Sequence, residues 1–175
     1  IPYKPRDAFL PFHETQARFT SIVAHRRAGK TVAAINNQLR KAVNFTKYPD
    51  GRFGYVAPFR QQAKDVAWTY LKRFVAPIPG TEISESELHV LLPNGARIRL
   101  YGSDNYEAMR GLYFDDVIMD EIADHHPRAY PEVIRPALSD RMGSATFIGT
   151  AKGKNAFYEI HTRAEADPEW FTMRL

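Results

Sequence analysis

The chain has 175 residues, of which 44% are hydrophobic and 13% aromatic, and its formal net charge is +4. This length and composition fit one globular domain with a substantial core and exclude a disordered chain. No run of about 18 apolar residues is present, which excludes a membrane-spanning helix, and the absence of cysteine excludes disulfides and thiolate metal sites. Because the chain begins with Ile1 and shows no signal peptide, we expect it to be a piece of a longer protein.

The positive charge is concentrated in the first part of the chain. Residues 1–75 contain 14 Lys and Arg against 4 Asp and Glu, a net charge of +10. Residues 76–175 contain 10 and 16, a net charge of −6, and the two parts sum to +4. A basic first half fits contact with polyphosphate or nucleic acid, although ordinary solvated charge gives the same pattern.

The first elements surround a glycine-containing connection. Residues 1–20 are rich in proline, and residues 13–16 are expected to open a short helix. The apolar run at residues 21–25 predicts the first strand, and residues 31–45 predict a helix with one apolar face.

Between this strand and this helix lies Gly29-Lys30-Thr31. The full phosphate-binding pattern is G-x-x-x-x-G-K-[ST], and Ala24 occupies the position of its first glycine. The backbone N–H groups from Arg27 to Thr31 can still surround a phosphate at a helix N-terminus, where the helix dipole favours anions. Lys30 can reach the β- and γ-phosphates of a nucleotide, and the Thr31 hydroxyl can ligate Mg²⁺. The sequence therefore predicts a P-loop.

The middle of the chain changes from helical to extended patterns. Residues 53–57 predict a second strand, and residues 60–75 predict a second helix. The apolar face of that helix is expected to comprise Val66, Ala67, Tyr70, Leu71 and Phe74. Residues 88–93 and 96–101 flank an Asn-Gly pair, which predicts a β-hairpin.

Residues 116–121 form an apolar run that ends in two adjacent carboxylates, and they predict a buried parallel strand. Asp120 is placed to hold Mg²⁺, directly or through water, and Glu121 is placed to orient and deprotonate an attacking water. An acidic cap on a core strand is the alternative interpretation. Together with the P-loop, the adjacent Asp120 and Glu121 favour nucleotide hydrolysis. The use of a glutamate to position water distinguishes this kind of hydrolase from GTPase-type switches, which use glutamine.

The last elements continue the alternation of strands and helices. Residues 127–138 and 155–166 predict helices, and residues 145–149 and 171–175 predict strands. This alternation predicts an α/β fold with a mostly parallel central sheet, helices on both faces and a β-hairpin. Since ligands bind at the carboxyl ends of such strands, we expect residues 25–31, 120–121 and 149–150 to converge.

Several segments of the chain resemble the large terminase subunit of tailed bacteriophages, the motor that pumps DNA into a procapsid. Residues 25–31 resemble the family's deviant Walker A with its early arginine, and residues 117–121 resemble its Walker B with the catalytic glutamate. Residues 148–158 resemble its coupling motif, and Gln16 lies upstream of the P-loop, as an adenine-recognising glutamine does in this family. Arg110-Gly111 is also similar to the family pattern, whereas Ala151 replaces the proline that commonly follows Thr150.

The resemblance implies a RecA-like P-loop NTPase of the ASCE type. Residues 1–175 would form a single ATPase domain, with residues 1–20 as the adenine-side segment and residues 21–175 as the P-loop core. The family's second domain is a metal-dependent nuclease, and no acidic cluster of that kind is supplied by this chain. We therefore expect an Mg²⁺-dependent ATPase that does not cut DNA.

The site residues that follow are of four kinds. The catalytic ones are Glu121, Arg26 and Lys30; those that bind ATP are Gln16, Arg26, Arg27, Ala28, Gly29, Lys30 and Thr31; the metal ligands are Thr31 and Asp120; and the coupling residue is Thr150. An arginine such as Arg26 can stabilise charge on the γ-phosphate in the transition state. The alternatives left open are surface residues for Arg26, Arg27 and Gln16, and a strand-end cap for Thr150.

The resemblance also implies partners. These are double-stranded DNA, the portal protein, the small terminase subunit and further copies of the chain in a ring. We expect a monomer in isolation, no membrane association, and a location in the host cell cytoplasm with transient docking on the viral procapsid. An arginine finger for a neighbouring copy could come from Arg73, Arg97, Arg99 or Arg135.

Two other functions remain possible from the sequence. A helicase core shares the glutamine, the P-loop and the Asp-Glu pair but usually needs a second RecA-like domain. A nucleotide-gated DNA-binding or assembly module would bind ATP with negligible hydrolysis, and Glu121 argues against it, because a pure binder needs no carboxylate to activate water.

Overall fold

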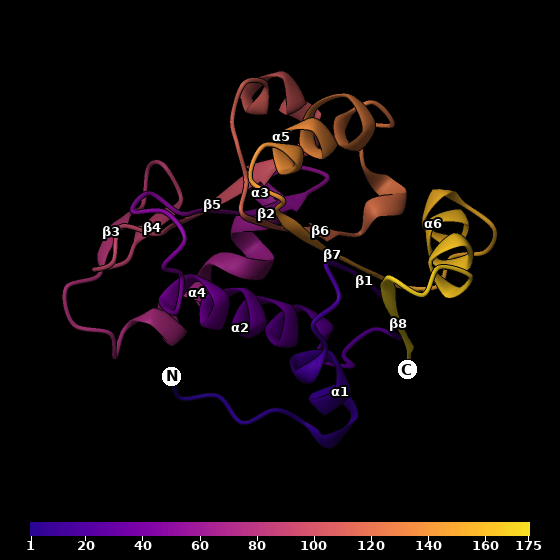
Figure 1. The fold of residues 1–175 in the computed structure, drawn as a ribbon, viewed down its shortest axis with the longest axis horizontal. Coiled ribbons are helices and arrows are strands. Elements are labelled where there is room, and N and C mark those ends of the chain that lie inside the picture. Colours follow the sequence, from indigo (N-terminus) through magenta and orange to yellow (C-terminus); the bar gives the residue numbers. More distant parts are fainter.

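The computed structural model describes residues 1–175 and is built on one eight-stranded sheet (Figure 1). The strands are, in chain order, β1 (Phe19–Val23), β2 (Arg52–Ala57), β3 (Glu82–Ser84), β4 (His89–Leu91), β5 (Arg97–Gly102), β6 (Asp116–Asp120), β7 (Ser144–Gly149) and β8 (Trp170–Arg174). Their order across the sheet is β3-β4-β5-β2-β6-β7-β1-β8. The strands from β5 to β8 in this order pair in parallel, and β3 and β4 pair antiparallel at one edge.

Helices cover both faces of the sheet. They are α1 (Leu10–Glu14), α2 (Lys30–Val43), α3 (Arg60–Ala63), α4 (Thr69–Val75), α5 (Arg135–Ser139) and α6 (Ala156–Glu165). Short 3₁₀ segments lie at Asp7–Phe9, Ser103–Met109 and Ile122–Asp124, and π-helical turns lie at Lys64–Trp68 and Tyr130–Ile134. Figure 1 shows α1, α2 and α4 on one side of the sheet and α5 and α6 on the other. The predicted mostly parallel sheet with helices on both faces is confirmed.

Two apolar cores follow from the alternation of side chains along the central strands. On β6, Ile118 faces a core of 27 buried residues shared with α2 and α4. Its neighbours Val117 and Met119 face a core of 13 buried residues shared with α5 and the start of α6. Because both faces of β6 are buried, the strand reads as a continuous apolar run, and the charged residues that follow it are held at a fixed edge of the sheet.

The predicted β-hairpin is confirmed, since β4 and β5 pair antiparallel around the turn that contains Gly95, whose φ is +88°. The third antiparallel strand, β3, was not predicted, because its three residues alternate too briefly to give a pattern. None of the helices is both long enough and apolar enough to cross a membrane.

Three predicted helices differ from the structure. Residues 13–16 do not open a helix; α1 ends at Glu14, because Pro11 favours a helix that begins just before it and the backbone of Thr15 is extended. The helix over residues 60–75 contains a π-helical turn, and the predicted apolar residue Val66 is exposed there. The helix predicted at residues 127–138 begins only at Tyr130, with Pro131 in its first turn.

Candidate functional site

The P-loop joins β1 to α2 at the carboxyl edge of the sheet. Gly29 adopts a left-handed conformation with φ of +95° and caps α2 without a side chain, so the first N–H groups of a 14-residue helix remain open to a ligand. Arg27 is also left-handed, with φ of +63°. Ala24 is buried, has no positive φ, and donates its N–H to the carbonyl of Gly149 over 3.1 Å. The alanine therefore replaces the pattern's first glycine without backbone strain.

Lys30 is the first residue of α2 and is only 8% exposed. Its ammonium lies close enough to Asp120 to lower the pKa of that carboxyl, although it forms no ion pair with it. A buried cation without a partner favours an anionic ligand. Thr31 follows in the same turn and is half-buried.

Asp120 is the last residue of β6 and is buried, and the two oxygens of its carboxylate differ in their hydrogen bonding. The hydroxyl of Tyr55 on β2 donates a hydrogen bond to Oδ2, whereas Oδ1 is buried without any partner. Burial raises the pKa of Asp120 to about 6, and the charge of Glu121 acts in the same direction, while the Tyr55 hydrogen bond lowers it. A buried carboxylate oxygen without a partner is an oxygen ligand for a cation.

Glu121 lies at the convergence of two strand ends. Its φ of 53° is left-handed, which is uncommon for a glutamate and turns the chain at the end of β6. The Glu121 N–H donates to the carbonyl of Ile148 over 2.9 Å. Its carboxylate accepts hydrogen bonds from the Thr150 hydroxyl (3.2 Å) and the Thr150 N–H (3.4 Å).

These contacts bring together the three predicted strand ends. The Ala24 N–H ties the P-loop to β7, and Thr150 at the end of β7 holds Glu121 at the end of β6. The sheet order β6-β7-β1 makes this possible, because β7 lies between the other two strands. The expected convergence is confirmed.

Three predicted residues have no partner across the site. Arg26, Arg27 and Gln16 are all exposed. The Gln16 amide donates only to the carbonyl of Glu14, over 3.4 Å, in the turn after α1. Its role with adenine, and those of the two arginines, stay predictions.

The four candidate fingers lie on three elements. Arg73 is on α4, Arg97 and Arg99 are on β5, and Arg135 begins α5. Arg99 pairs with Glu87 over 2.9 Å. The choice among them stays a prediction.

The structure adds four residues that the sequence did not indicate. Arg6 donates to the carbonyl of Ala28 over 3.0 Å and so ties the N-terminal segment to the P-loop. Tyr55 holds Asp120, as described above. The buried His125 contacts the carbonyl of Asp120 over 2.6 Å, and burial lowers the pKa of His125 to about 4, so it is neutral at physiological pH. Lys152 lies 3.7 Å from Glu121.

No local sequence signal marks Tyr55, Arg6 or His125, and Lys152 lies within the segment 148–158 that resembles the coupling motif but was not singled out there. Tyr55 is an aromatic residue inside a strand, Arg6 is a charge in a proline-rich segment, and His125 and Lys152 lie in loops. Each is brought to the site only by its neighbours in the fold.

Comparisons with known proteins agree with this geometry. A family model for the N-terminal part of the terminase large subunit, T4likevirus type, matches residues 22–172. The large terminase subunit of Thermus virus P23-45 is 28% identical over an alignment that covers 91% of this chain and 36% of that protein. The chain thus spans about a third of the length of the curated relatives it matches.

Solved structures show the same fold. The large terminase ATPase domain of Thermus phage P74-26 gives a TM-score of 0.81 at 24% identity, over 98% of this chain and 81% of that one. A large terminase of a thermophilic bacteriophage, solved in complex with ATP-gamma-S, gives a TM-score of 0.69 at 12% identity, over 91% of this chain and 39% of that one. The predicted RecA-like fold is confirmed. With the family model covering most of its length, the chain belongs to the T4likevirus-type terminase large subunits and matches their N-terminal part.

Proposed function

We propose that this chain binds ATP with Mg²⁺, hydrolyses it, and serves as the ATPase of a motor that moves double-stranded viral DNA into a procapsid. The observation that carries the proposal is the meeting of the P-loop, Asp120 and Glu121 at one edge of the sheet, joined through Thr150. Membership of the terminase family supports it. So does the binding of ATP-gamma-S by a terminase of the same fold.

The P-loop would bind the triphosphate. The open N–H groups at the start of α2, the helix dipole and the buried Lys30 ammonium all favour an anion at the same point. The exposed Arg26 and Arg27 lie in the same loop, and their side chains are free to turn toward it. Arg26 would stabilise the charge that develops as the γ-phosphate leaves.

The residues at this edge also fit Mg²⁺. The buried Oδ1 of Asp120 lacks a partner, and the Thr31 hydroxyl stands in the first turn of α2, so both supply the oxygen ligands that Mg²⁺ prefers. Bound there with ATP, Mg²⁺ would neutralise negative charge on the phosphate oxygens.

Glu121 would act on water. A water that attacks the γ-phosphorus forms a new P–O bond as the bond to the β-phosphate oxygen breaks, and its proton passes to a base. The Glu121 carboxylate is the base at this edge, and the two hydrogen bonds from Thr150 orient it. Because Thr150 directly follows β7, a change at Glu121 would be transmitted to the loop that leads into α6, which is the coupling that we propose for Thr150.

The proposed partners are double-stranded DNA, the portal protein, the small terminase subunit and neighbouring copies of the chain in a ring. Their place of action would be the host cell cytoplasm, on the procapsid. The basic character of residues 1–75, with a net charge of +10, supports contact with DNA and nucleotide.

The test compares ATP binding with ATP turnover in three variants. Lys30→Ala should abolish tight binding. Glu121→Ala should still bind ATP but lose about 10²–10⁴-fold in turnover, the scale of a lost general base. Asp120→Ala should lose Mg²⁺-dependent affinity.

Normal affinity in Lys30→Ala would refute the P-loop assignment, and equal binding defects in the Glu121 and Asp120 variants would refute the division of their roles. Tight ATP binding without turnover in the full-length protein with DNA would favour the nucleotide-gated module. Strand displacement by that protein would favour the helicase.

A further inference from the structure

A lysine close to Glu121 takes no part in the functions described so far. Lys152 lies in the loop between β7 and α6, two residues after Thr150. Its Nζ is 2.7 Å from Oδ2 of Asp124 and 3.7 Å from Oε2 of Glu121. The ammonium therefore stands beside the carboxylate that we propose to act on water.

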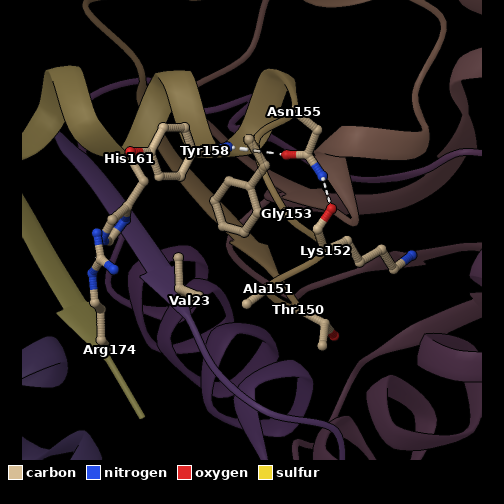
Figure 2. Close-up of a pocket in the computed structure, with 10 residues that line it drawn as sticks. Val23, Thr150, Ala151, Lys152, Gly153, Asn155, Tyr158, His161 and Arg174 are labelled. Carbon is tan, nitrogen blue, oxygen red and sulfur yellow. Dashed lines mark hydrogen bonds between the residues drawn. The ribbon is translucent and has the colours of Figure 1, made fainter.

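The loop that carries Lys152 is tied to the start of α6 by hydrogen bonds. The Asn155 side chain donates from Nδ2 to the carbonyl of Lys152 over 3.3 Å and accepts at Oδ1 from the Tyr158 N–H over 3.1 Å, which caps α6. Gly153 provides the turn with φ of +75°. Figure 2 shows these two hydrogen bonds, and the side chains of Lys152 and Thr150 point to the same side, away from Arg174. The Lys152 side chain can therefore turn without breaking the hydrogen bond to its own carbonyl.

A small cavity of about 60 Å³ lies between this loop, α6 and the ends of β1 and β8 (Figure 2). It is lined mainly by apolar surface, and the Lys152 ammonium is directed to its two carboxylates instead. The Lys152 ammonium therefore points away from this cavity and toward the proposed nucleotide site.

A second cation, Arg26, lies near Lys152 in addition to its two acidic partners. The hydrogen bond to Asp124 raises the pKa of the Lys152 ammonium, so it stays charged, while Arg26 is close enough to act in the opposite direction. Two cations, one from the P-loop and one from the loop after β7, therefore repel each other across the site. A negatively charged group between them would remove that repulsion.

We propose that Lys152 is a further cation for the γ-phosphate of ATP, and that Asp124 and Glu121 hold it while no nucleotide is bound. The proposal rests on the function proposed above. The Lys152 and Asp124 side chains are 38% and 50% exposed, and ion pairs this exposed contribute little to stability. A triphosphate can therefore draw the ammonium away at small cost.

The same movement prepares Glu121. While Lys152 is close, the ammonium competes with water for the Glu121 carboxylate. Once the ammonium turns to the γ-phosphate, the hydrogen bonds from Thr150 still orient that carboxylate, which is then free to accept a proton. ADP lacks the γ-phosphate and should leave Lys152 with its acidic partners.

The test measures dissociation constants for ATP-gamma-S and for ADP, both with Mg²⁺, in the protein and in Lys152→Ala. We expect about a tenfold loss of ATP-gamma-S affinity, the scale of one hydrogen bond to a charged group, and less than about a twofold change for ADP. Lys152→Arg should keep most of the preference for ATP-gamma-S. The control is Lys154→Ala, two residues on in the same loop, which removes an exposed charge that pairs with no acidic residue. Equal losses for both nucleotides, or no loss for either, would overturn the proposal.

Asp124→Asn gives a second test with the opposite sign. Removing this acidic partner frees Lys152, so ATP-gamma-S should bind about two- to fivefold more tightly, the scale of an exposed ion pair, with ADP unchanged. Weaker binding of ATP-gamma-S would contradict the competition. A protein that binds no ATP-gamma-S would overturn the proposed function together with this inference. A protein that prefers ATP-gamma-S equally with and without Lys152 would overturn the inference alone.

Discussion

Tyr55→Phe tests how the carboxylate that we propose as an Mg²⁺ ligand, Asp120, is positioned. The Tyr55 side chain is 1% exposed, and its hydroxyl donates to one oxygen of Asp120 while the other oxygen has no partner. Phenylalanine keeps the ring in the core and removes only the hydroxyl. The buried Oδ2 then loses its donor, and that hydrogen bond no longer fixes the orientation of the carboxylate.

The expected loss of Mg²⁺ affinity follows from the environment of this hydrogen bond. A hydrogen bond to a charged group is worth about 1.5–3 kcal/mol, and loss of a partner that orients a metal ligand typically costs about 10- to 100-fold in metal affinity. We therefore expect the Mg²⁺ concentration for half-maximal ATP hydrolysis to rise about 10- to 100-fold, with a smaller change in ATP binding without metal.

Mg²⁺ titrations of ATPase activity and of nucleotide binding measure this effect. The matched control is Tyr101→Phe, because Tyr101 lies opposite Val56 on the neighbouring strand β5 and does not contact Asp120. An unchanged Mg²⁺ dependence in Tyr55→Phe would refute the idea that Tyr55 positions Asp120. An equal change in Tyr101→Phe would show a general effect on the sheet.

Four further predictions concern other parts of the molecule. Arg6→Ala removes a charged donor to the P-loop backbone and should weaken ATP and ADP binding alike, by about three- to tenfold, in equilibrium titrations; unchanged affinities would exclude this role. Arg26→Ala should slow hydrolysis in an assembled, DNA-stimulated motor with a modest effect on ATP binding, and an unchanged rate would make Arg26 a surface charge. Burial lowers the pKa of His161 below its ordinary 6.5, and Arg174 donates to its ring over 3.2 Å. The stability that neutral His161 contributes is therefore fully present above pH 6.5 and is lost as the pH falls through the pKa of the folded state. The free energy of unfolding, measured with denaturant, should therefore fall less on acidification in His161→Gln. The isolated chain should be a feeble, monomeric ATPase whose activity per chain rises with concentration, since an arginine in trans is worth about 10³–10⁵-fold; a high rate that stays flat on dilution to monomer would contradict this.

The fold follows from the sequence where its patterns are long. The buried run before Asp120 and the apolar run before the P-loop both became parallel strands, because neither face of such strands meets water. The differences lie in short or proline-containing segments. Proline fixes where a helix can begin but not how far it continues, so α1 ended where the sequence predicted a start.

The candidate site was predictable in its local motifs and, through the fold class, in the convergence of its three strand ends. Gly29, Lys30 and Thr31 form a continuous motif, and Asp120 and Glu121 are adjacent, so spacing along the chain sufficed. The roles of Tyr55, Arg6 and Lys152 depend on which strands and segments are neighbours in space. Spacing along a single sequence does not reveal those neighbours. Their chemistry became apparent only from contacts across the sheet edge.

The most direct measurement is a crystal structure of the protein with ATP-gamma-S and Mg²⁺. The account predicts the triphosphate along residues 24–31, with Mg²⁺ between the Thr31 hydroxyl and the free Oδ1 of Asp120. It also predicts the γ-phosphate within reach of Lys30, with Glu121 facing the side from which water attacks. A nucleotide bound elsewhere, or Mg²⁺ without contact to Asp120 directly or through water, would contradict the central claim.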